Sequence, residues 1–141
     1  MFLDASAIVA ILASAPSAGL LLAKLETPGG RIFCSPVARF AAVQLIADRL
    51  RRRRGDAAAA PEDVAASEEL VDGLLDLIGA RDIHITEGIG REARAIAARF
   101  GAVVGHPAQL NLDDCLAAAC ARAYRVRLLH DSDRFTLSNL G

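Results

Sequence analysis

The sequence predicts an α/β domain with a mainly parallel central sheet flanked by helices on both faces. Short apolar segments such as Phe2–Asp4 and Arg125–Leu129 have the length of buried strands, and the longer Ala-rich segments between them favour helices. When strands alternate with helices, a parallel sheet is expected, because each crossover connection runs through a helix. At 141 residues the chain fits one domain over residues 1–141, and it shows no internal repeat.

The predicted helices are bounded by residues that commonly begin or end helices. Ser6 can cap the first helix, and Ser35-Pro36 begins the third, because a hydroxyl accepts an N–H of the first turn and proline suits the first helical position. The second helix ends at Pro28-Gly29-Gly30. We therefore expect helices at Ala7–Ala13, Ala18–Leu25, Pro36–Arg53, Pro61–Leu77, Ile89–Phe100 and Leu112–Tyr124.

Four segments are predicted to form the strands. Phe2–Asp4 begins the sheet, and Arg31–Cys34 follows the glycine turn. Asp82–Thr86 alternates between polar and apolar side chains, which is typical of a strand with one buried face. Arg125–Leu129 is the last strand, because its apolar residues follow directly on a helical segment. A loop is expected over Gly101–Gln109.

Composition and charge narrow the class of protein. A net charge of −1 gives no overall sign of nucleic-acid binding, although almost all basic residues are Arg, which suits contacts with phosphate, and Lys24 is the only lysine. The 53% hydrophobic content predicts apolar surface left over for a partner. No apolar run has the length of a membrane span, and Asp4 lies where a secretory signal carries positive charge, so a cytoplasmic protein is expected. Three cysteines without metal-ligand spacing are expected to be reduced, half-buried thiols: Cys34, Cys115 and Cys120.

Three aspartates lie where apolar elements end or begin. Asp4 ends the first strand, Asp114 begins the last long helix, and Asp133 follows the last strand. Side chains at the carboxyl ends of parallel strands converge in the crevice where α/β folds bind ligands. Three carboxylates that meet there cannot all stay ionised at low cost unless a cation joins them. The sequence therefore predicts a site for a hard metal ion, Mg²⁺ or Mn²⁺.

Four segments distributed along the chain carry a more specific pattern. They are Leu3–Leu12, Cys34–Phe40, His106–Cys115 and Leu128–Phe135. Each is a weak signal alone, but their order, with acids at the ends or starts of apolar elements, is specific. With these segments the chain resembles the PIN-domain ribonucleases and, among them, the VapC-type toxins of bacterial VapBC toxin–antitoxin pairs.

The resemblance implies a metal-dependent endoribonuclease site built from about four acids. By position, Asp4 is the central metal ligand, Asp114 is the acid on the late helix, and Asp133 is the acid after the last strand. An Mg²⁺ or Mn²⁺ ion held by such oxygens keeps waters, one of which can attack phosphorus. Weaker candidates, which would support a ligand or touch substrate, are Ser6, Asn111, His130 and Asp131.

One acid of the family pattern is missing. After Arg39-Phe40 the pattern has Glu, whereas this sequence has Ala41. Two explanations are open: a natural loss, or a substitution made to silence a toxic nuclease, and the intact remainder of the motif favours the second. In either case we expect weaker metal binding and poor cleavage.

Local roles for the same acids are also possible. Asn111 and Asp114 have the spacing of a helix capping box, and Asp133 lies in an Asp-Ser-Asp sequence that suits a turn. Arg51–Arg54 suits a solvated helix end, whereas Arg122, Arg125 and Arg127 are better placed to steer a phosphate backbone.

Two functions remain open, which differ in whether the protein cleaves RNA. The first is an endoribonuclease toxin that cleaves structured RNA (tRNA or rRNA), is inhibited by a small VapB-like antitoxin, and forms a homodimer or a toxin–antitoxin hetero-oligomer. The second is a non-catalytic PIN-fold module that binds RNA or antitoxin. An aspartate-based phosphatase is disfavoured, because Ser6 stands where such an enzyme has a second Asp and no lysine follows Lys24.

Overall fold

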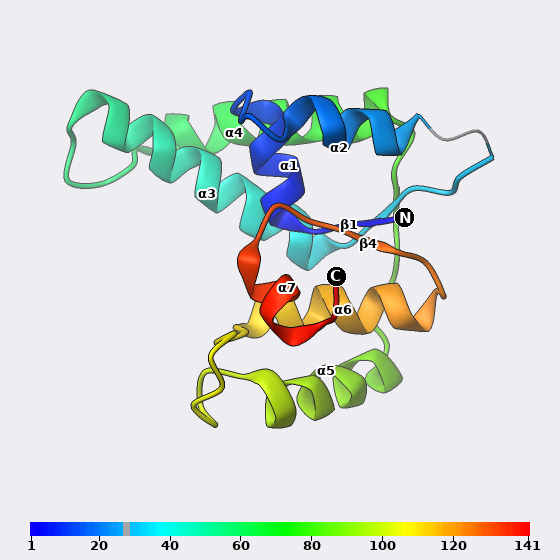
Figure 1. Cartoon of the computed structure of the whole chain (residues 1–141). Helices are drawn as coiled ribbons and strands as arrows, with labels where there is room; N and C mark the ends of the chain where they lie inside the picture. The colour runs from blue at the N-terminus through cyan, green and yellow to red at the C-terminus, as the bar shows by residue number, and fades with distance from the viewer. Residues whose placement is uncertain (27–28) are drawn as a thin grey trace.

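The structure is a computed structural model that describes residues 1–26 and 29–141 (Figure 1). The described residues form seven helices and four strands. In chain order the elements are β1 Phe2–Leu3, α1 Ala5–Leu12, α2 Ala18–Leu25, β2 Phe33–Cys34, α3 Pro36–Arg54, α4 Pro61–Leu77, β3 Arg81–Asp82, α5 Glu87–Phe100, α6 Leu112–Ala123, β4 Leu128–Leu129 and α7 Asp133–Ser138.

The four strands form one parallel sheet in the order β3-β2-β1-β4. Phe2 is opposite Phe33 on one side, and Leu3 is opposite Leu129 on the other. Helices α1 to α4 gather on one side of the sheet and α5 to α7 on the other (Figure 1). The predicted α/β class, with a parallel sheet between two layers of helices, is confirmed.

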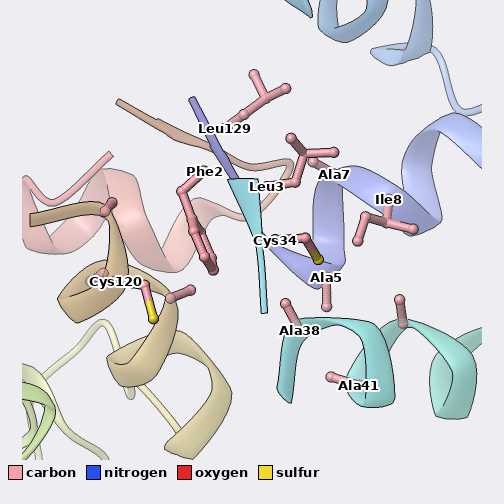
Figure 2. Packing of buried hydrophobic residues seen from close by; sticks show 14 of the residues in the cluster. Phe2, Leu3, Ala5, Ala7, Ile8, Cys34, Ala38, Ala41, Cys120 and Leu129 are labelled. Atoms are coloured by element: carbon pink, nitrogen blue, oxygen red, sulfur yellow. The ribbon is translucent and has the colours of Figure 1, made fainter. Parts of the chain in front are cut away.

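Small side chains let the helices pack closely around β1. Figure 2 shows the Phe2 ring pointing towards Cys120 on α6, whereas Leu3 points to the opposite face of the sheet, as expected for consecutive strand residues. On that second face, Ala5 of α1 lies beside Ala38 of α3 (Figure 2). Some of the alanines therefore lie in the core, where their small side chains let the start of α1 approach α3.

The strands are shorter than predicted. Thr86 is the N-cap of α5 and accepts a hydrogen bond from Ile89 N at 3.2 Å, so the alternating segment Asp82–Thr86 leads into a helix and only Arg81–Asp82 pairs. Arg125 has a φ of 53°, a left-handed conformation that a strand does not adopt, so it does not belong to the predicted strand. Of that segment, only Leu128–Leu129 forms β4.

The helices agree more closely, with three corrections. Helix α5 begins at Glu87, two residues before the predicted Ile89. The N-cap of α1 is Asp4 and not Ser6, so the helix begins two residues earlier than predicted. Helix α7 was not predicted at all: Ser132 caps it by accepting from Arg134 N at 3.3 Å, and Asn139 ends it with a φ of 56°. The bounds of α2 and α4 are as predicted, although Pro28, part of the predicted stop signal, lies outside the described residues.

The cysteines are free, as predicted, but buried rather than half-buried. Burial raises the pKa of the Cys34 thiol to about 12 and that of Cys120 to about 11. Both thiols therefore stay protonated in the folded protein at neutral pH.

Large apolar side chains also lie on the surface, as the composition predicted. Phe40 on α3, Leu77 on α4 and Val103 in the loop before α6 are exposed. Among the described residues, no helix has the length and apolar character that spanning a bilayer requires.

Candidate functional site

The first acid, Asp4, is fixed at the carboxyl end of β1, one of the two inner strands of the sheet. Its backbone N–H donates to Leu129 O at 3.0 Å, which continues the pairing of β1 with β4. Its side chain caps α1, because Oδ2 accepts from Ser6 N at 2.9 Å and from Ser6 Oγ at 2.5 Å. The residue is 3% exposed. The sequence thus places a carboxylate at the strand end, and the helix that follows holds it in one orientation.

The electrostatic state of Asp4 differs from that of a surface acid. Burial raises the pKa of its carboxyl from 3.8 to about 6, and the negative charge of Asp114 contributes in the same direction. The hydrogen bonds from Ser6 oppose this rise because they stabilise the ionised form. Asp4 therefore lies in a place where a nearby cation would favour its charged form.

The second acid, Asp114, is buried in the first turn of α6. Its N–H donates to Asn111 Oδ1 at 3.0 Å, and its Oδ2 accepts from Asn111 N at 3.0 Å. The capping box considered from the sequence is therefore present. The capping role is compatible with a role in a functional site. The box holds the carboxylate of Asp114 close enough to Asp4 that its charge raises the pKa of Asp4.

Ser6 connects this pair to the loop after β4. Its Oγ donates to Asp4 and accepts from the backbone N–H of Asp131 at 3.0 Å. The side chain of Asp131 is exposed. Ser6 and Asn111 are thus the two sequence-predicted polar residues that hydrogen-bond directly to the acids.

The surroundings of Asp133 and His130 differ from those of the buried acids Asp4 and Asp114. Asp133 is exposed as the first residue of α7. The His130 ring packs on Phe135 with a centroid distance of 4.9 Å, and burial lowers its pKa. Among the described residues, no group of three or more His, Cys, Asp or Glu side chains is arranged to hold a metal ion. The described side chains therefore bring together Asp4 and Asp114, and Asp133 does not join them.

An arginine that sequence reasoning missed contacts the pair. Arg134, the second residue of α7, places Nη1 3.1 Å from Asp114 Oδ2. The contact spans 20 residues of sequence, and it depends on α7, which was not predicted. Ser132 was the available signal, because a serine before Asp133 and Arg134 can cap a helix as well as form a turn.

The position of the missing acid borders the same region. Ala41 is 6% exposed and lies one helical turn after Ala38, which lies beside Ala5 at the start of α1 (Figure 2). Ala5 directly follows Asp4. A longer side chain at position 41 would therefore extend from the face of α3 that packs against the beginning of α1.

The donor set fits a hard divalent cation. Asp4 and Asp114 provide carboxylate oxygens, and Mg²⁺ is commonly bound by one or two carboxylates together with waters and substrate phosphates. The raised pKa of Asp4 is the observation that supports the fit, because a bound cation would offset the cost of two buried negative charges.

The comparisons with known proteins cover nearly the whole chain. The PIN domain family model matches residues 1–137. A VapC ribonuclease of Rhizobium meliloti is 36% identical over 146 residues, covering 99% of both chains. Ribonuclease VapC42 of Mycobacterium tuberculosis is 34% identical over 143 residues, covering 99% of this chain and 96% of that protein.

A solved structure shows the same fold. Mycobacterium tuberculosis VapC20, described as a sarcin–ricin loop cleaving toxin, superposes with a TM-score of 0.59. The match covers 96% of this chain and 92% of VapC20, at 18% sequence identity. The family match, the relatives and the fold agree with the resemblance found in the sequence, and the chain belongs to the PIN domain family.

Proposed function

We propose that this protein is a metal-dependent endoribonuclease of the VapC toxin type and that it acts as a phosphodiester hydrolase. The observation that carries the proposal is the burial of Asp4 beside Asp114 at the carboxyl end of β1. The relatives named VapC ribonucleases, which are 36% and 34% identical over nearly the full length, support the nuclease assignment.

In this proposal the two buried carboxylates hold Mg²⁺ or Mn²⁺. The bound ion would supply stabilisation of the phosphate charge and a water of lowered pKa. Asp4 is kept in place by the hydrogen bonds from Ser6, and Asp114 by its capping box with Asn111. Asp133, exposed as the first residue of α7, is the third proposed ligand.

The residues around the pair predict weak activity for the chain as it stands. Ala41 supplies no carboxylate, and Arg134 places a positive charge against Asp114. These two features favour the alternative function, a non-catalytic module that binds RNA or antitoxin. We expect the substitution Ala41→Glu to distinguish the two functions by whether it restores cleavage.

The proposed partners follow from the relatives. VapC toxins pair with VapB antitoxins, so we propose a small VapB-like antitoxin, with a homodimer or a toxin–antitoxin hetero-oligomer as the assembly. Exposed apolar residues such as Phe40 and Leu77 are available for such contacts. The proposed substrate is structured RNA, tRNA or rRNA, and the proposed location is the cytoplasm.

A ribonuclease assay with substitutions at position 41 tests the proposal. The parent protein, Ala41→Glu and Ala41→Gln are incubated without antitoxin on total cellular RNA with Mn²⁺ or Mg²⁺, and each reaction is repeated with EDTA. We expect Ala41→Glu alone to give discrete, EDTA-sensitive cuts, and Asp4→Asn in the same background to abolish them. Gln matches Glu in size but lacks its charge. If folded Ala41→Glu does not cut, the binding module becomes the better description.

A further inference from the structure

We propose that Arg134 is a built-in counter-cation of the acid pair, which occupies Asp114 in the metal-free protein and competes with the divalent cation for it. This inference rests on the proposed function, because it concerns the same two carboxylates. It adds a residue of this chain that regulates access of the metal to them.

The geometry places the guanidinium where it can act in this way. Arg134 Nη1 lies 3.1 Å from Asp114 Oδ2, the same oxygen that accepts from Asn111 N. The Arg134 side chain is 47% exposed, whereas that of Asp114 is 9% exposed. The arginine therefore approaches the buried carboxylate from the solvent side and can leave by rotating its side chain, without unpacking the core.

The surroundings separate this contact from an ordinary surface ion pair. Arg91 and Glu87 on α5 form a contact of the same 3.1 Å, but their side chains are 63% and 87% exposed. Water screens such a pair, so it contributes little. Asp114 is instead buried next to Asp4, where two negative charges repel each other. A positive charge at Asp114 consequently reduces the repulsion between Asp4 and Asp114, whereas the exposed pair of Arg91 and Glu87 has no such repulsion to reduce.

A divalent cation bound by Asp4 and Asp114 would also reduce the repulsion between the two carboxylates, as Arg134 does. Because both cations are attracted to the same oxygens and repel each other, each binds at the expense of the other. Removing the arginine charge should therefore have two opposite effects: the metal-free protein becomes less stable, and the metal binds more tightly. A side chain with only a packing role would not produce both effects.

The test is a Mn²⁺ titration by isothermal calorimetry, combined with melting curves in EDTA. The proteins are the parent, Arg134→Gln, Arg134→Lys, the matched control Arg91→Gln, and Asp4→Asn. For Arg134→Gln we expect about two- to fivefold tighter Mn²⁺ binding, the range of a partly exposed ion pair. In EDTA its melting temperature should fall by about 2–4 °C. Arg134→Lys keeps the charge and should stay near the parent, as should Arg91→Gln.

The outcomes separate failure of this inference from failure of the proposed function. If Asp4→Asn abolishes Mn²⁺ binding but Arg134→Gln binds no more tightly than the parent, the competition is refuted and the metal site stands. If Arg134→Gln and Arg91→Gln tighten binding equally, the effect is general surface charge, and the inference again fails. If none of the proteins binds Mn²⁺, or Asp4→Asn binds it as well as the parent, the proposed metal site itself fails and takes the inference with it.

Discussion

Replacing Asp4 with Asn is expected to stabilise the metal-free protein at alkaline pH, although it removes a proposed metal ligand. The Asp4 carboxyl has its pKa raised from 3.8 to about 6, mainly by burial. At about 1.36 kcal/mol per pKa unit, ionising this group costs the folded state at most about 3 kcal/mol. Asn has the same shape and keeps an oxygen that can accept from Ser6 N, but it carries no charge.

The pH dependence of this gain has a defined sign. Because the folded-state pKa is raised, the native protein binds the Asp4 proton more tightly than the unfolded chain does, and stability is lost as pH rises from about 4 to above 6. The advantage of Asp4→Asn should therefore be at most about 3 kcal/mol near pH 8 and fall to at most about 1 kcal/mol near pH 4.5.

Urea denaturation in EDTA at both pH values measures this difference. Asp133→Asn is the matched control, because Asp133 was predicted as a ligand but is exposed. Its unfolding free energy should change by less than about 0.5 kcal/mol. A destabilised Asp4→Asn, or a gain that is the same at both pH values, would show that Asp4 is not held in a low-dielectric site, and the electrostatic basis of the proposed metal site would be lost.

Three further predictions concern two residues at helix starts and one buried thiol. Ser35→Ala should cost about 1 kcal/mol of unfolding free energy in urea, because Ser35 Oγ caps α3 by accepting from Ala38 N at 3.1 Å. Ser17→Ala should be neutral or slightly stabilising, because Ser17 Oγ is shielded from solvent and has no hydrogen-bond partner among the described residues. If the two serine substitutions changed the unfolding free energy equally, this difference between the two helix starts would be contradicted. The Cys34 thiol should react with a disulfide reagent at about pH 8 only as fast as the protein unfolds, because its side chain is fully buried. The raised pKa, about 12, slows the reaction further, and rapid labelling of the folded protein would refute that burial.

Local sequence signals predicted the helices well and the strands less well. The bounds of α2 and α4 were correct because prolines and glycines near helix ends, such as Pro61 at the first position of α4, act within about one turn of the chain. Strand ends depend on pairing with distant segments, so β3 and β4 contracted to the residues that find partners in the sheet. The turn residues Asp131-Ser132-Asp133 illustrate the limit, since the same residues can make a turn or begin α7.

The candidate site was predictable only in part. Asp4 and Asp114 could be expected near one another because a strand end and a helix start meet at the carboxyl edge of a parallel sheet. The direction of a side chain in α7 cannot be read without the helix itself, so the contact of Arg134 with Asp114 could not be predicted. Ala41 could be identified as a missing acid only through the family pattern, because nothing in an alanine on a helix marks a lost carboxylate.

In the proposed function, Asp4 and Asp114 together hold a divalent cation. The most direct measurement is anomalous diffraction from crystals of Ala41→Glu grown with Mn²⁺, with metal-free crystals as the reference. We predict one strong peak within coordination distance of carboxylate oxygens from both Asp4 and Asp114. A peak at the exposed acids Asp131 and Asp133 instead, or no peak in a correctly folded protein, would contradict the claim.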